Sequence, residues 1–191
     1  MPDDDERMKY YRSSGWNLNN IATTDGSVLK VIETDINGVN VPWLYLGQLF
    51  ATFCWHNEDN YLYSVNYSHL GAPKQWYGIP GADAGAYERV LRDVVPERLR
   101  EEPDLIYHIT TMISPSLLKN NDVPVYQLVQ RPGEFIVTFP QAYHGGFSHG
   151  VRMLAAGDSR ARALAILCLR PLTLAPPLFF LPPHSTTAAK R

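Results

Sequence analysis

Cysteine is scarce in this chain, which has only Cys54 and Cys168 among 191 residues. Two cysteines cannot build a disulfide framework, and no Cys-x-x-Cys pair is present, which excludes the usual cysteine-based zinc modules. An excess of basic charge is also lacking, because 17 Lys and Arg stand against 19 Asp and Glu. We therefore expect a reducing compartment and no direct sequence-specific binding of nucleic acid.

Long hydrophobic runs are missing as well. The most apolar stretch, residues 163–181, contains Arg170 and is broken by three prolines. A membrane-spanning helix needs roughly 20 apolar residues with few charges, so we expect no membrane partner. The N-terminal sequence MPDDDERMKYY is acidic where a secretory signal would be basic and then apolar. These features predict a soluble intracellular protein.

Hydrophobic residues make up 45% of the chain and aromatic residues 12%, which is enough for a buried core. The composition changes near Gly150, after which Ala, Leu, Arg and Pro dominate. A Pro-rich run without a period does not support regular strands or a stable helix. We predict an acidic disordered start at 1–11, a folded domain at 12–149, and a separate, poorly ordered tail at 150–191.

The folded part is predicted to be rich in strands. Short β-branched or aromatic runs and alternating patterns predict strands at 27–36, 49–55, 61–67, 74–79 and 134–139. Helices are predicted at 82–95, at 104–112, and after Ser114, an N-cap followed by Pro115. The turn Gly71-Ala72-Pro73 predicts that 61–67 and 74–79 form a hairpin. This order predicts an all-β core, a barrel or sandwich, with a helical insert.

A candidate metal site begins with His56-Asn57-Glu58 at the end of an aromatic strand. Residues two apart on an extended backbone project to the same face, so the imidazole and the carboxylate can chelate one ion. His144, after the strand that ends at Pro140, is the best candidate for a third ligand. Two histidines and a carboxylate suit non-heme Fe(II) and leave three positions open. The spacing alone also fits an incidental pair at a strand end.

A second group of side chains surrounds this candidate site. Ser64 and Asn66 share one strand face, and Lys74 and Trp76 share a face on another strand. A lysine beside small polar groups suits the anchoring of a dicarboxylate, because a fixed cation pairs with a carboxylate away from water. The pattern alone favours a solvated turn lysine at this position. From the pattern alone, Phe53 is predicted to be a core residue and Tyr45 an aromatic residue at a strand end.

Several segments carry a family resemblance: FCWHNED (53–59), YSVNYSHLGAPKQWYGIPG (63–81) and VPVYQLVQRPGEFIVTFPQAYHGGFSHG (123–150). They closely resemble the Jumonji C (JmjC) catalytic domain, in particular the JARID type, lysine demethylase family five. The resemblance is collinear over roughly residues 12–149. It implies a double-stranded β-helix, or cupin-like jelly roll, that uses Fe(II), 2-oxoglutarate as cosubstrate, and dioxygen.

The resemblance also assigns roles by position. His56, Glu58 and His144 match the iron ligands, which are also the catalytic residues. Asn66 and Lys74 match residues that hold the far carboxylate of 2-oxoglutarate. Three further residues match positions that line the cosubstrate pocket: Phe53, Ser64 and Trp76. Tyr45 matches a tyrosine near the methylated substrate lysine.

The implied activity is demethylation of methylated lysine four of the histone-three tail. The expected partners are a methylated histone tail peptide and chromatin-associated proteins, and the expected location is the nucleus.

Two departures from the family pattern set limits on this expectation. The family's upstream Gly-rich stretch with its tyrosine has no counterpart, and the Ala-Val-Asn-Phe run expected after Gly150 is replaced by unrelated residues. We therefore expect a β-helix incomplete at both ends, as in a truncated or misread gene product. Two rival hypotheses stay open: a non-catalytic remnant with a chromatin-interaction role or none, and a protein hydroxylase of the same superfamily.

Overall fold

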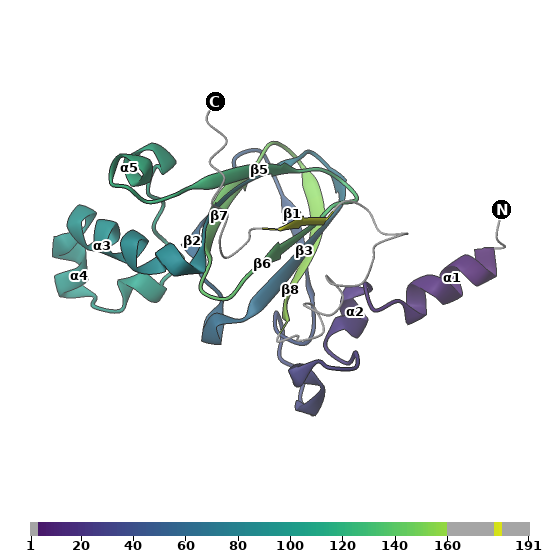
Figure 1. Ribbon diagram of the computed structural model, residues 1–191. Coiled ribbons are helices and arrows are strands. Elements are labelled where there is room, and N and C mark those ends of the chain that lie inside the picture. The colour runs from purple at the N-terminus through teal and green to yellow at the C-terminus, as the bar shows by residue number, and fades with distance from the viewer. Residues whose placement is uncertain (1–3, 160–177, 181–191) are drawn as a thin grey trace.

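A computed structural model describes residues 4–159 and 178–180 of the chain. Two β-sheets face each other and form its centre (Figure 1). One sheet has the strand order β1-β8-β3-β6-β9 and the other has the order β2-β7-β4-β5. Their bounds are β1 Trp43–Gly47, β2 Thr52–His56, β3 Tyr63–Gly71, β4 Lys74–Ile79, β5 Tyr126–Gln130, β6 Phe135–Thr138, β7 Tyr143–Ser148, β8 Arg152–Ser159 and β9 Leu178–Phe180.

All neighbouring strands are antiparallel except β6 and β9, which are parallel. Because strands close in the sequence alternate between the sheets, the arrangement is that of a double-stranded β-helix. The predicted all-β core with a helical insert is confirmed.

Short helices surround the sheets. Before β1 lie α1 Asp4–Ser13, α2 Leu18–Ile21 and the 3-10 helix η1 Val28–Val31, and η2 Asp59–Tyr61 follows β2. The insert between β4 and β5 contains η3 Gly81–Asp83, α3 Ala84–Val94, α4 Pro96–Glu101, η4 Leu105–Tyr107 and α5 Pro115–Asn120. None of the helices in the described part of the chain has the length and apolar character needed to cross a membrane.

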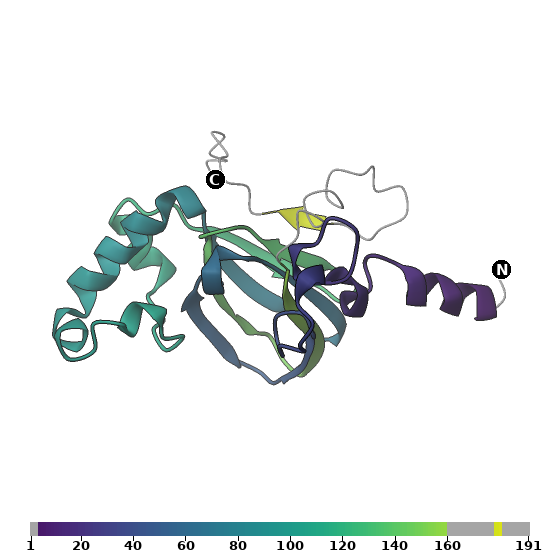
Figure 2. The same cartoon turned by 90° about the horizontal axis from the view of Figure 1, so that it is seen from below.

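The helical insert packs at one side of the β-helix (Figure 2). Tyr87 and Leu91 on α3 and Leu118 on α5 share a buried cluster with Trp55 on β2 and Ile79 on β4. The predicted helix at 82–95 and the predicted start at Ser114 are confirmed, and the Ser114 side chain accepts a hydrogen bond from the Ser116 N–H. The insert therefore backs the sheet that carries β2, on which His56 lies.

The predicted hairpin is wrong. β3 pairs with β6 and β8 in one sheet, whereas β4 pairs with β5 and β7 in the other. The alternating pattern correctly predicted the two strands. It could not identify their partners, because strands on opposite sides of a shared core show the same alternation.

Three local predictions also need correction. Residues 27–36 contain η1 rather than a strand, because Ser27 caps this turn by accepting from the Leu29 N–H. Residues 104–112 contain only η4, and the carbonyl of Thr111 instead accepts from the Trp55 N–H. The start of the chain is helical from Asp4, and Arg7 lies 5.8 Å over the ring of Tyr11 one turn further on.

The expectation that a separate tail begins at residue 150 is wrong for the strand β8. This strand lies between β1 and β3, so it occupies the interior of its sheet. Arg152 and Leu154 are buried there. Strand pairing uses the backbone, so a strand can form without the expected side-chain pattern. The rest of the predicted tail, at 160–177 and 181–191, lies outside the described residues.

Candidate metal centre and adjoining pocket

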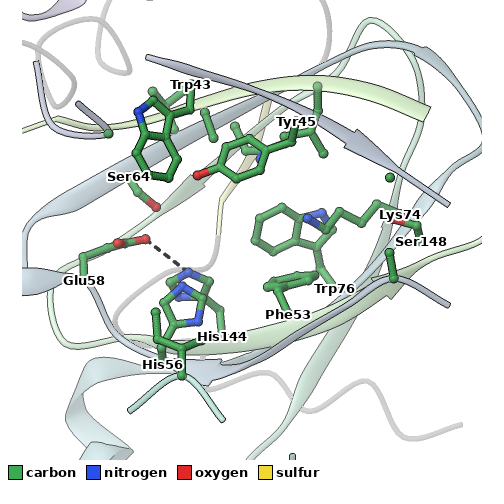
Figure 3. Close-up of a pocket in the computed structure, with 18 of the residues that line it drawn as sticks. Trp43, Tyr45, Phe53, His56, Glu58, Ser64, Lys74, Trp76, His144 and Ser148 are labelled. Atoms are coloured by element: carbon green, nitrogen blue, oxygen red, sulfur yellow. Dashed lines mark ion pairs between the residues drawn. The ribbon is translucent and has the colours of Figure 1, made fainter. Parts of the chain in front are cut away.

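His56, Glu58 and His144 meet at one point between the two sheets (Figure 3). His56 is the last residue of β2, and its register partner on β7 is His144. Glu58 follows β2 with an extended backbone. Their ligand atoms all lie within 4.8 Å of one another, and His144 Nε2 is 3.2 Å from Glu58 Oε1. The three residues could hold one metal ion.

An irregularity in β2 brings His56 to this point. The pairing of β2 with β7 shifts register between Phe53 and His56. In a regular strand, residues three apart point to opposite faces, but here both side chains line the same pocket, while Trp55 is buried in the cluster with the insert. The bulge therefore lets β2 place Phe53 and His56 in the pocket and Trp55 in the buried cluster with the insert.

Backbone carbonyls set the orientation of both imidazoles. His56 Nδ1 lies 2.8 Å from the Cys54 carbonyl oxygen, and His144 Nδ1 lies 3.0 Å from that of Ala142. A carbonyl oxygen only accepts, so each Nδ1 carries a hydrogen and donates it. In each ring, Nε2 is then the nitrogen available as a metal ligand.

Burial and neighbouring groups hold His56 and Glu58 in the protonation states of metal ligands. Burial, followed by the nearby His144, lowers the pKa of His56 to about 4. Burial alone would raise the pKa of the Glu58 carboxyl, but the hydrogen bond and charge of His144, the charge of His56 and a hydrogen bond from Ser64 outweigh it and lower that pKa. A neutral imidazole and an ionised carboxylate are the protonation states that bind metals.

A pocket of about 510 Å³ adjoins the three residues. It brings together every site residue that the sequence predicted. These are Tyr45, Phe53, His56, Glu58, Ser64, Asn66, Lys74, Trp76 and His144. Figure 3 shows the histidines and Glu58 at one end of the group and Lys74 with Ser148 at the other.

Lys74 is enclosed by aromatic rings. Its Nζ lies 3.9 Å from the ring centroid of Phe53 and 5.0 Å from that of Trp76. Burial, together with the charge of Arg152, lowers the pKa of Lys74 to about 7. In the described part of the chain, Lys74 forms no ion pair with a carboxylate. The alternative of a solvated turn lysine is therefore excluded.

A buried amide fixes two of the pocket residues. Gln130 on β5 is fully buried, and its Oε1 accepts from Trp76 Nε1 at 3.0 Å and from Arg152 Nη2 at 3.3 Å. Its Nε2 donates to Asn66 Oδ1 at 3.1 Å. Sequence reasoning missed this residue because a glutamine in a strand usually indicates the solvent-facing side.

Other missed residues lie at the two ends of the pocket. Thr138 Oγ1 is hydrogen-bonded to Ser64 Oγ, beside Glu58. Ser148, the register partner of Lys74, lines the opposite end. Sequence reasoning missed both residues because Thr138, at the end of β6, and Ser148, at the end of β7, belong to no distinctive sequence pattern. Arg152 was missed because it lies beyond residue 149, where we expected no folded structure.

The mouth of the pocket is aromatic. Trp43 and Tyr45 on β1 both line the pocket, and their ring centroids lie 6.0 Å apart. The Tyr45 side chain points towards the pocket in Figure 3, although the residue is partly exposed. The mouth of the pocket is therefore both apolar and accessible from solvent.

The fold and the site define a class: a double-stranded β-helix whose two sheets enclose a His-x-Glu…His metal-binding set. Residues 43–158 match the family model described as JmjC domain, hydroxylase. The chain belongs to the JmjC domain family. The match runs past residue 149, where the sequence resemblance was expected to end, and takes in most of β8.

Proteins named as demethylases are similar to this chain over most of its length. Lysine-specific demethylase JMJ17 of Arabidopsis thaliana is 51% identical over 146 residues, which is 76% of this chain and 12% of the relative. JMJ703 of Oryza sativa is 55% identical over 140 residues, covering 73% and 11% respectively. Lysine-specific demethylase 5B of Gallus gallus is 47% identical over 146 residues, covering 76% and 10%. The chain spans about a tenth of the length of these curated relatives.

Proposed function

We propose that this chain carries an Fe(II)- and 2-oxoglutarate-dependent lysine demethylase site that acts on a methylated histone tail. Its preferred substrate in this proposal is methylated lysine four of histone three, with a nuclear location and chromatin-associated partners. The observation that carries the proposal is the pairing of a two-histidine, one-carboxylate set with a partly buried cation, Lys74, at the other end of the same pocket. Relatives named as lysine-specific demethylases support the substrate class.

The residues present fit both groups. Two imidazoles and one carboxylate match the ligand preference of non-heme Fe(II) and leave positions open for other ligands. Lys74, buried among Phe53 and Trp76 without a carboxylate partner in the described residues, is suited to an anionic group. A molecule that chelates a metal at one end and has a carboxylate at the other, such as 2-oxoglutarate, matches a pocket with metal ligands at one end and Lys74 at the other.

The protein would contribute position and the exclusion of water. His56, Glu58 and His144 would hold the iron, and Asn66 and Lys74 would hold the far carboxylate of the cosubstrate. When bound, the iron and 2-oxoglutarate supply the oxidative chemistry with dioxygen that hydroxylates an N-methyl group. Phe53 and Trp76 would keep the pocket dry, and Tyr45 would orient the methylated side chain at the mouth.

The test is formaldehyde release from a trimethylated lysine-four peptide of histone three, with Fe(II) and 2-oxoglutarate added to the full chain. We expect release that depends on both additions and is lost in His56→Ala. The same peptide methylated at another lysine is the specificity control. Equal turnover of both peptides would contradict the lysine-four assignment, and release that survives His56→Ala would contradict the metal assignment.

Protein hydroxylation is the second candidate, because the matching family model is itself described as a hydroxylase. The mass of the peptide product separates the two reactions. Demethylation removes one carbon and two hydrogens from the peptide, whereas stable hydroxylation adds one oxygen. A non-catalytic remnant would do neither. The remnant hypothesis was based on the expected loss of a core strand after residue 150. β8 occupies that part of the chain and lies in the interior of its sheet, so this support for the hypothesis is removed.

A further inference from the structure

Arg152 is a second cation buried next to Lys74. Its side chain enters the protein from β8, where its register partners are Gly47 on β1 and Gly71 on β3. Arg152 is only 1% exposed. A Cβ atom at Gly47 would lie 3.0 Å from Arg152 Cγ, so the glycine leaves the room that the arginine side chain occupies.

The guanidinium of Arg152 is only partly satisfied. Nη2 donates to Ser68 Oγ at 3.2 Å and to Gln130 Oε1 at 3.3 Å. Nε and Nη1 are buried and have no hydrogen-bond partner among the residues that the structure describes. Nor does Arg152 form an ion pair with any carboxylate whose position the structure describes. A buried charge without a counter-ion is costly, so this arrangement calls for an anion.

Arg152 and Lys74 belong to the same end of the pocket. Lys74 has the register partners Gln130 and Ser148. Gln130 accepts a hydrogen bond from Arg152, and both Ser148 Oγ and Arg152 Cγ would lie 3.0 Å from a Cβ atom at Gly47. The charge of Arg152 also contributes to the lowered pKa of Lys74. Arg152 lies behind the residues that line the pocket and acts through them.

We propose that Arg152 is a positioning residue for anion binding, whose charge and hydrogen bond to Gln130 make the Lys74 end of the pocket select a dianionic cosubstrate over a monoanionic one. The inference rests on the proposed use of a 2-oxo dicarboxylate. A positive charge near a carboxylate stabilises the bound carboxylate. Two neighbouring cations that form no ion pair with a carboxylate among the described residues also make the empty site costly. The gain in selectivity therefore comes from both the attraction and the relief of repulsion.

The test compares two ligands on the Mn(II)-loaded full chain by isothermal titration calorimetry. 2-Oxoglutarate is the dianion, and 2-oxovalerate has the same carbon chain with a methyl group in place of the far carboxylate. In Arg152→Gln, which keeps an N–H donor but has no charge, we expect the affinity for 2-oxoglutarate to fall by about tenfold or more. The affinity for 2-oxovalerate should stay within about twofold, and Arg152→Lys should restore much of the preference for the dianion.

A purely structural role gives a different pattern, since distortion of the pocket would weaken both ligands equally. Equal losses in Arg152→Gln, or no loss at all, would overturn the proposal. If Arg152→Gln does not melt cooperatively, Lys74→Met provides the test with Arg152 intact. In that variant a reduced preference for 2-oxoglutarate must remain, and equal binding of the two ligands would also overturn the proposal.

The outcome is separable from that of the proposed function. A chain that binds 2-oxoglutarate in this Arg152-dependent manner but releases no formaldehyde from any methylated peptide refutes the demethylase proposal and keeps the inference. A chain that demethylates the peptide, but in which Arg152→Gln weakens the binding of both ligands by the same factor or of neither, keeps the function and refutes the inference.

Discussion

His56 on β2 and His144 on β7 are register partners, and the centroids of their rings lie 4.3 Å apart. Two antiparallel strands thus set their spacing, and backbone carbonyls fix both rings through Nδ1. The geometry of the two candidate ligands does not depend on a metal, because the orienting contacts are made by the backbone. Such preorganisation favours tight and specific binding of a divalent ion.

Metal binding should therefore stabilise the chain and depend on His56. At Mn(II) about 100-fold above the dissociation constant, we expect a gain of about 2.7 kcal/mol in the free energy of unfolding. His56→Ala should abolish the gain, which a thermal melt with and without Mn(II) measures. The matched control is His108→Ala, because that exposed histidine in the insert pairs with Asp104 and does not line the pocket. A gain that persists in His56→Ala contradicts the assigned site.

The binding of 2-oxoglutarate should take up a proton at Lys74. The pKa of Lys74 in the unliganded protein is about 7, and a bound carboxylate raises it. Above pH 7 the lysine must gain a proton on binding, so the affinity should fall with rising pH by up to about tenfold per unit. Of the groups whose charges act with Lys74 on this end of the pocket, Arg152 stays charged up to about pH 10 and His56 stays neutral above about pH 4.

Calorimetry at pH 8 in buffers of different ionisation enthalpy measures this uptake. Lys74→Met is the control and should show none. A binding enthalpy that does not depend on the buffer would contradict the lowered pKa. The same pKa predicts that the stability of the unliganded chain rises between about pH 7 and the ordinary lysine value of 10.5, since the unfolded chain then binds more protons.

Trp55 should couple the helical insert to the metal-bearing strand. Its Nε1 donates to the Ile113 carbonyl oxygen at 2.8 Å, and its backbone N–H donates to that of Thr111. Trp55→Phe leaves a buried carbonyl without its donor, so we expect a loss of about 1–3 kcal/mol in the free energy of unfolding by urea denaturation. Trp43→Phe, at a half-exposed residue, is the comparison and should change stability by less than about 0.5 kcal/mol. Equal effects would show that the bond to Ile113 contributes little.

The site was more predictable from the sequence than the strand pairing that builds it. His56-x-Glu58 is a local pattern, His144 and Lys74 were candidates from their positions in the sequence, and the family resemblance matched all four to functional positions. All of them line one pocket. The sheet partners of β3 and β4 were mispredicted because alternation reports a buried face and carries no information on the partner strand. β8 and Arg152 were missed because strand formation there depends on two neighbouring strands rather than on local composition.

Gly146 tests how closely the pocket wall is packed around the metal-bearing strand. It lies on β7 opposite Phe53 and Trp76. A Cβ atom there would overlap the Gln75 carbonyl oxygen and lie 2.9 Å from Phe53 Cε1. Backbone cannot yield as a side chain can, so Gly146→Ala should destabilise the chain by about 1–3 kcal/mol and weaken Mn(II) binding. The control is Gly85→Ala in α3, where a Cβ atom meets nothing within 4 Å and should stabilise the helix by up to about 1 kcal/mol. Urea denaturation of both variants gives the comparison. If Gly146→Ala changed neither the free energy of unfolding nor Mn(II) binding, β7 could shift without disturbing His144.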